Sequence, residues 1–269
     1  MRFLLFGLLL FVTACRRPSR QLAATLTPLN KPTEATTQTP TPSLPDFSRN
    51  LRAGDELVAL GNDPDWSMTI NPTQGLRFKS FNGDSVLSNV PQRLNDSDGS
   101  FRFNVDLSDS AGRIRVLFRP DSCVDNASGY RFDYRVEVDV HGKSYLGCGV
   151  SLRQITLLQD TWVLTSFQNH TVTAGGPRNE LPRLEISLTN QRVTGTTGCN
   201  RLSGKVQSDS RQIRFGPLVT TKMACAGETG RFEGDFLEAL SQPLTYRVGE
   251  GNLILLQDGK PLMTFRKTD

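Results

Sequence analysis

The clearest pattern in the chain is an alternation of apolar and polar residues with a period of two. It runs without a break from Tyr130 to Val140, where aromatic and aliphatic side chains alternate with Arg, Asp and Glu. Successive side chains of a strand point to opposite faces of a sheet, so this segment predicts a strand with one buried and one solvated face. Shorter alternations of the same kind occur in Phe101–Leu107, Ile114–Phe118 and Leu184–Leu188. Glycine-containing turn signals separate these segments, which predicts antiparallel β-structure over most of the chain.

One late segment has helical spacing instead. Phe232, Phe236, Leu237 and Leu240 fall at i, i+4, i+5 and i+8, between Gly230 and Pro243. We expect a helix of about ten to twelve residues, which Gly234 weakens by about 1 kcal/mol relative to alanine. The expected fold class is therefore mainly β: two small antiparallel sheet-like or barrel-like domains, the C-terminal one with a single packed helix.

The N-terminus has a third pattern, an unbroken apolar run that follows Arg2. A run of about ten residues covers roughly half of the ~30 Å hydrocarbon core of a bilayer, so it is too short to span it. It predicts a signal peptide over residues 1–14. Val12-Thr13-Ala14-Cys15 resembles the bacterial lipobox, which implies cleavage before Cys15 and acylation of that residue with palmitate or similar chains. The alternative is an ordinary signal peptide followed by a chance cysteine.

Residues 15–48 are rich in Thr, Pro, Ser and Gln. Such a composition buries too little apolar surface to order itself, so we expect a disordered tether with a reach of about 30 Å or more. The β-patterned remainder divides into an N-terminal β domain, 49–156, and a C-terminal domain, 157–269. Since Arg16 rather than Asp follows Cys15, resemblance to enterobacterial sorting rules favours the periplasmic face of the outer membrane.

Charge excludes one class of partner. The chain has 31 Lys and Arg against 27 Asp and Glu, a formal net charge of +4. That balance is too weak to indicate nucleic-acid binding. The expected partners are the membrane, through the lipid anchor, and envelope proteins or peptidoglycan, and we expect a monomer.

The C-terminal half carries two specific motifs. Gly195-Thr196-Thr197-Gly198-Cys199-Asn200-Arg201-Leu202-Ser203-Gly204 fits the pattern G-x-x-GCN-x-x-x-G, and Thr220–Cys225 fits a T-x-MAC segment. With the helix and late strands that follow, this half resembles the META domain, the family of the heat-shock lipoprotein HslJ. The resemblance implies a role in stress response or antibiotic tolerance. It supplies no catalytic activity.

The N-terminal half carries weaker motifs. Ala59–Trp66 resembles the "GNEPFW" signature of uncharacterised bacterial envelope lipoproteins, and the segments Cys123–Tyr130 and Tyr145–Gly149 resemble their C-x-DGMSG and Y-x-GCG segments. Asp65 stands where an aromatic residue is common, and Asn126-Ala127 replaces Gly-Met. Asp63, Asp65, Trp66 and Asp125 are the candidate binding residues of this half.

After Cys15 is set aside, four cysteines remain, two in each expected domain. In an oxidising envelope such pairs favour disulfides, and one pair per domain joins Cys123 to Cys148 and Cys199 to Cys225. Each bridge closes a loop of about 25 residues, which is worth roughly 3 kcal/mol in the chain-entropy model. A structural zinc site is the weaker alternative, since the chain has no closely spaced C-x2–4-C pair.

Catalytic signatures are weak. The chain contains no G-x-S-x-G elbow, and His141 and His170 adjoin turn residues. Asp63, Asp65 and Asp125 would form a carboxylate cluster if the loops after Gly61 and Cys123 met, although loop carboxylates more often cap turns. We therefore expect a non-enzyme without cofactor or metal: a lipid-anchored envelope protein that binds a partner or serves in stress tolerance. The alternatives are an inhibitor of an envelope-directed hydrolase such as lysozyme, and an uncharacterised hydrolase.

Overall fold

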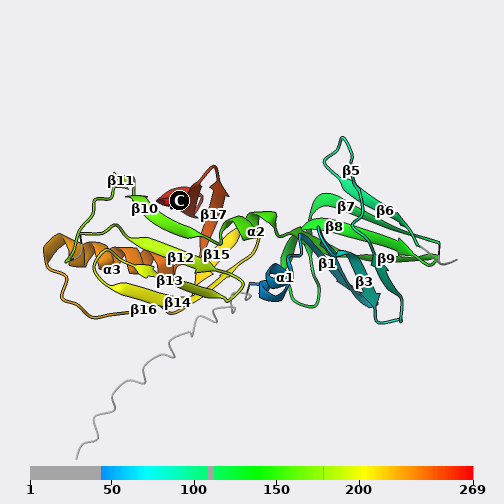
Figure 1. Ribbon diagram of the computed structural model, residues 1–269, viewed down its shortest axis with the longest axis horizontal. Helices are drawn as coiled ribbons and strands as arrows, with labels where there is room; N and C mark the ends of the chain where they lie inside the picture. Colours follow the sequence, from blue (N-terminus) through cyan, green and yellow to red (C-terminus); the bar gives the residue numbers. More distant parts are fainter. Residues whose placement is uncertain (1–43, 108–111, 178, 269) are drawn as a thin grey trace, which may run out of the picture. The chain divides into compact units, whose positions relative to one another are not determined.

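The computed structural model describes residues 44–107, 112–177 and 179–268 (Figure 1). The predicted signal peptide, Cys15 and most of the predicted tether therefore lie outside the described residues. Over those described ranges, no helix combines the length and the apolar character that crossing a membrane requires. The described part of the chain is mainly β, as predicted, with two sheets and three helices.

The first sheet is open and has nine antiparallel strands in the order β4-β3-β2-β1-β9-β8-β7-β6-β5. Its strands are β1 (Leu57–Asn62), β2 (Asp65–Asn71), β3 (Gly75–Ser80), β4 (Ser85–Ser88), β5 (Arg93–Asn95), β6 (Phe101–Asp106), β7 (Arg113–Val124), β8 (Arg131–Val140) and β9 (Lys143–Ser151). Two meanders, β1–β4 and β5–β9, join where β1 pairs with β9. The long alternating segment is β8, as predicted, and its buried side chains are Phe132, Val136, Val138 and Val140.

Aromatic side chains fill the concave core of this sheet. Phe101 and Phe118 stack with ring centroids 4.8 Å apart, and Phe78 meets Tyr145 edge-on at 5.1 Å. The buried Tyr145 hydroxyl donates to the Asp84 carboxylate, as its polar end needs a partner when the ring is buried. That bond, together with the ammonium of Lys143 at 2.9 Å, lowers the pKa of Asp84 to about 2. The ionised Asp84 thus ties the β3–β4 turn to the start of β9.

The second sheet closes into an eight-stranded barrel, because β10 pairs with both β12 and β19. The barrel strands are β10 (Thr161–Phe167), β12 (Arg183–Ser187), β13 (Arg192–Thr196), β14 (Arg201–Ser208), β15 (Gln212–Phe215), β17 (Leu244–Gly249), β18 (Asn252–Gln257) and β19 (Lys260–Lys267). Two short strands add to it: β11 (His170–Thr171) pairs with β10, and β16 (Val219–Thr220) pairs with β14.

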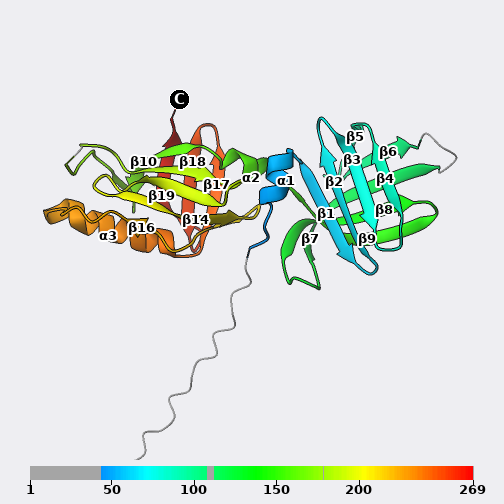
Figure 2. The ribbon, with the colours of Figure 1, turned by 60° about the horizontal axis from the view of Figure 1, so that its bottom comes forward.

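The predicted helix is α3 (Gly227–Ser241), which runs beside β14 and β16 in both views (Figures 1 and 2). It buries Phe236, Ala239 and Leu240 in the barrel core. The helix begins at Gly227, earlier than predicted. The prediction missed its first turn because that turn is polar and glycine-rich and shows no helical spacing of apolar residues. Glu228 in that first turn faces the positive end of the helix dipole, which favours a carboxylate there.

Two short helices were not predicted. They are α1 (Ser48–Ala53) and α2 (Arg153–Leu157), and each is too short to show a helical period. The predicted tether is wrong at its C-terminal end, which was placed at residue 48. Leu44 and Phe47 are buried, at 7% exposure each, so residues that precede α1 already pack against the core.

Candidate functional site

The Gly61–Trp66 motif folds as the hairpin between β1 and β2. Gly61 lies opposite Trp66 in the register, and Asp63 and Pro64, joined by a cis peptide bond, make the turn. The Trp66 indole is only 4% exposed and its N–H donates to the carbonyl of Leu146 at 3.0 Å. Trp66 is therefore a core residue, and its hydrogen bond joins β2 to β9.

The two N-terminal motifs meet through one hydrogen bond, from the amide of Asn62 to the carboxylate of Asp125. Asp125 also accepts bonds from the hydroxyl and the backbone N–H of Ser128, and it is 5% exposed. Burial is the largest single influence and raises the pKa of Asp125, but the bonds from Ser128 and Asn62 together outweigh it and lower that pKa. Asp125 is thus an ionised acceptor. It stabilises the turn that contains Ser128 and binds Asn62 at the end of β1.

The predicted carboxylate cluster does not form. The loops after Gly61 and Cys123 do meet, but an amide and a carboxylate make the contact. Asp63 and Asp65 are exposed, and among the described residues no trio of potential metal ligands includes either of them or Asp125. The geometry of paired carboxylates needed for acid–base chemistry is therefore not built from these three side chains.

Three of the four predicted binding residues nevertheless share one hollow of about 710 Å³, which we call the Asp65 groove. It is lined by Pro45, Asp46, Phe47, Asn50, Val58, Leu60, Gly61, Asn62, Asp65, Trp66, Ser67, Lys79, Ser80, Phe81, Asp125, Ala127, Ser128, Tyr130 and Phe132. Asp65, Trp66 and Asp125 are among these residues, and Asp63 is not. Because Trp66 is buried, it supports the wall of the groove and offers little accessible surface to a ligand.

The groove also contains residues that the sequence did not single out. Phe81 is 84% exposed although it is a large aromatic residue, and it follows β3 at the groove. Its position just before Asn82-Gly83, a turn signal, is the only sequence feature that hints at an exposed aromatic. Asp46 is exposed, and the backbone N–H of Ser48 lowers its pKa. The lining therefore combines apolar side chains with Asp46, Asp65 and Asp125 against Lys79.

Both expected cysteine pairs lie at disulfide distance and are bonded. Cys123 and Cys148 join β7 to β9, with Cα atoms 5.4 Å apart. Cys199 and Cys225 join the loop after β13 to the chain just before α3, with Cα atoms 6.3 Å apart. The first bridge joins two strands that both pair with β8 and not with each other.

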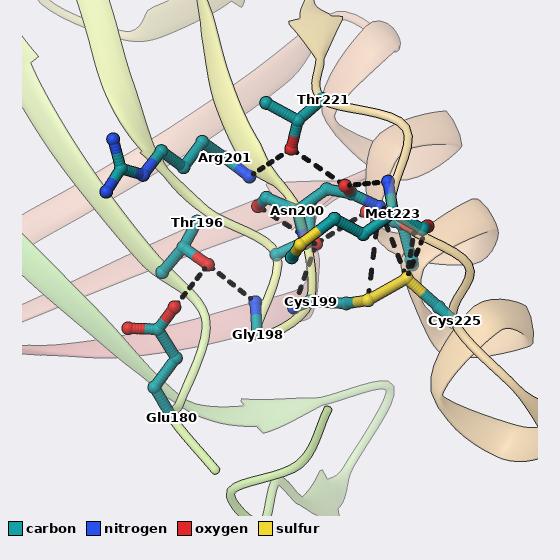
Figure 3. The surroundings of a disulfide bond; sticks show 11 residues. Glu180, Thr196, Gly198, Cys199, Asn200, Arg201, Thr221, Met223 and Cys225 are labelled. Carbon is teal, nitrogen blue, oxygen red and sulfur yellow. Dashed lines mark hydrogen bonds between the residues drawn. A yellow bond between two sulfur atoms is a disulfide. The ribbon is translucent and has the colours of Figure 1, made fainter. Parts of the chain in front are cut away.

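The GCN motif is organised by the side chain of Asn200, which is 3% exposed (Figure 3). Its Oδ1 accepts the hydroxyl of Thr221 at 2.7 Å and the backbone N–H of Met223 at 2.8 Å. Its Nδ2 donates to a carboxylate oxygen of Glu233 at 3.0 Å and to the carbonyl of Met223 at 3.3 Å. One buried amide therefore connects the GCN loop, the MAC segment and α3.

Glu233 completes this network from the helix. Its other carboxylate oxygen accepts the hydroxyl of Thr197 at 2.6 Å. In the described chain, the sulfur atoms of Cys199 and Cys225 and a carboxylate oxygen of Glu233 are the one trio of potential ligand atoms within 4.8 Å of one another. The two sulfur atoms are bonded to each other and lack the thiolate charge that metal binding needs, so the trio is a brace in this state.

These features define a mainly β protein with an open sheet, a closed barrel and one disulfide brace for each. Residues 155–269 match the META domain family, which confirms the family resemblance of this half. The matching residues include both cysteine motifs of the barrel. The resemblance of the N-terminal half to envelope lipoproteins stays a prediction.

Two solved structures are similar to part of the chain. One is an NMR structure that is 20% identical, with 40% of this chain and 89% of that chain covered and a TM-score of 0.34. The other, an NMR structure of a protein from Burkholderia xenovorans, is 25% identical, with 41% and 84% covered and a TM-score of 0.33. No curated protein matches the chain.

Proposed function

We propose that this chain is a lipid-anchored, non-catalytic binding protein of the bacterial cell envelope. Its Asp65 groove would hold a basic, partly apolar segment of another envelope protein. The observation that carries the proposal is the composition of that groove, where the exposed Phe81 and other apolar residues adjoin three aspartates and one lysine.

The chemistry of the groove favours binding over catalysis. Asp125 is already saturated by Ser128 and Asn62, and its lowered pKa keeps it ionised at neutral pH. It supplies a fixed negative charge and has no proton to donate. Asp65 is exposed and adds a second charge at the rim. Fixed charges beside an apolar floor attract a cationic partner and orient it, which is how charge complementarity contributes to recognition.

The proposed anchor has a direct test in Cys15, which lies outside the described residues. We expect Cys15→Ala to move the protein from the membrane fraction to the soluble fraction, because diacylation is what makes such attachment stable. Fractionation and intact-mass measurement check this. The matched control is the double variant Cys123→Ala/Cys148→Ala, which also removes cysteines but not the proposed acylation site, and should stay with the membrane. A Cys15→Ala protein that remains in the membrane fraction and has an unchanged mass would refute the anchor.

The proposed groove has its own test, by site-specific photo-crosslinking in intact cells. A photoreactive residue at position 81 should capture an envelope protein, because Phe81 lines the groove and is 84% exposed. The same residue at position 87 is the matched control, since Leu87 is 76% exposed and does not line the groove. We expect at least a fivefold stronger product at position 81 if one solvent-exposed charge pair and apolar contact contribute about 1 kcal/mol or more.

The charge of the rim is tested in the same cells. Asp65→Asn should weaken the position-81 product severalfold, whereas Asp63→Asn should not, because Asp63 lies in the same hairpin but outside the groove. Equal products at positions 81 and 87, or equal effects of the two Asp→Asn changes, would reject the groove as the binding site. An assay of lysozyme with the purified protein addresses the inhibitor alternative separately.

A further inference from the structure

A second cavity, of about 490 Å³, lies in the barrel half of the chain. Three segments line it: the β10–β12 connection through residues between 167 and 175 and through Glu180 and Pro182, the GCN loop at Thr197 and Gly198, and the first half of α3. Its volume falls within the about 300–1,000 Å³ typical of small-molecule sites. None of these segments contributes to the Asp65 groove, so the cavity is independent of the proposed function.

The walls of this cavity are braced against one another. The Cys199–Cys225 disulfide and the Thr197–Glu233 hydrogen bond of 2.6 Å fix the GCN loop to α3. The hydroxyl of Thr196 donates to Glu180 at 3.1 Å and fixes the same loop to the β10–β12 connection. Gly176, at φ +69°, packs so closely that a Cβ there would come within 2.5 Å of the Gly198 carbonyl. A cavity held open in this way spares a ligand the cost of ordering its site.

Aromatic rings form the apolar part of the lining. Phe167 and Phe232 both line the cavity and meet edge-on, with ring centroids 5.6 Å apart. Phe236 stacks on Phe232 at 5.9 Å and supports it from the barrel core. Phe232 is only partly buried, so the cavity offers aromatic surface to an apolar group or to a cation.

The charges of the lining are mostly negative. Glu180, Glu228 and Asp235 line the cavity, against one arginine, Arg231. In the part of the chain that the structure describes, no ion pair engages Glu228 or Asp235. Their charge is therefore available to a ligand on the aromatic floor. We propose that the barrel binds a small organic cation with an apolar body at this cavity, the body on Phe232 and the cationic head toward Glu228 and Asp235.

The test compares three probes with the same phenylpropyl body: 3-phenylpropylammonium, 3-phenylpropan-1-ol and 3-phenylpropionate. Amide NMR titrations of the full chain report both affinity and place. We expect the ammonium probe to bind about five- to tenfold more tightly than the alcohol, as two solvent-exposed charge contacts would give, and the carboxylate to bind most weakly. The shifted signals should come from 167–175 and 228–235 rather than from the Asp65 groove.

Substitutions at exposed positions then distinguish the effect of charge on probe binding from an effect on folding. The double variant Glu228→Gln/Asp235→Asn should bring the ammonium and alcohol probes to within about twofold of each other. Glu238→Gln is the matched control, because Glu238 is exposed on the same helix and does not line the cavity. No shifts in the cavity signals, equal binding of the carboxylate and ammonium probes, or an unchanged preference in the double variant would each overturn the proposal. These outcomes leave the Asp65 groove unaffected.

Discussion

Replacement of Asn200 by aspartate is expected to destabilise the protein by about 3–5 kcal/mol at neutral pH. The change keeps the acceptor that Thr221 and Met223 use but removes the Nδ2 donor. The new oxygen would lie near the Glu233 carboxylate, which is now 3.0 Å from Nδ2. A buried carboxylate and a partly buried one at that distance repel each other, and the hydrogen bond from Nδ2 is lost at the same time. Urea denaturation of the oxidised protein at pH 7 measures the loss.

The sign of the pH dependence follows from this repulsion. The introduced carboxyl group would have a folded-state pKa above its unfolded value, because protonation removes the repulsion and restores a donor. Its destabilising effect is therefore largest well above that pKa and shrinks as the pH falls through it. We expect a smaller stability deficit at about pH 4.5 than at pH 7.

A second substitution identifies the partner. Adding Glu233→Gln to Asn200→Asp should recover at least about 1 kcal/mol, because the new amide can donate to the introduced carboxylate while its oxygen still accepts from Thr197. A deficit that is the same at both pH values, and that Glu233→Gln does not relieve, would show that the Asn200–Glu233 contact is not what holds the loop.

The fold was predictable where the pattern is local. The period of two in β8 follows from the pleat of a strand, and the apolar stripe of α3 follows from its packing on the barrel core. Closure of the barrel could not be predicted from the sequence, because β10 pairs with β19 across about a hundred residues. Many other strands have an alternating pattern that would suit the same pairing. The start of α3 was missed because its first turn, Gly227–Gly230, is polar and glycine-rich and has no apolar periodicity.

The candidate site was predictable only in part, and for similar reasons. The motif residues Asp65, Trp66 and Asp125 do meet at one groove. Their roles could not be read, because Trp66 and Asp125 owe theirs to partners on other strands, Leu146 and Asn62. The cavity beside α3 was invisible in the sequence, since it is assembled from three separated segments and has no motif of its own.

Gly61→Ala is the second large effect, expected to cost about 3 kcal/mol or more. A Cβ at Gly61 would come within 2.3 Å of both the Leu146 carbonyl and the Trp66 indole nitrogen, which are bonded to each other. The φ of Gly61 is not positive, so the cost comes from packing and not from backbone strain. The added methyl group must displace a buried tryptophan or break its hydrogen bond. Thermal denaturation measures the loss, and a red-shifted tryptophan emission should accompany it.

Gly234→Ala is the matched control for this prediction. A Cβ at Gly234 meets no atom within 4 Å, and the residue lies inside α3. The same substitution should therefore stabilise the protein there by about 0.5–1 kcal/mol, because alanine is the better helix former. If Gly61→Ala were also neutral or stabilising, Trp66 would not be tightly packed against Gly61 of β1 and Leu146 of β9. The glycine of the motif would then need an explanation on the groove side, as a position that a bound partner approaches closely. If the loss is as large as expected, Gly61 and Trp66 are a packing pair, and the recognition role of the motif falls to Asp65.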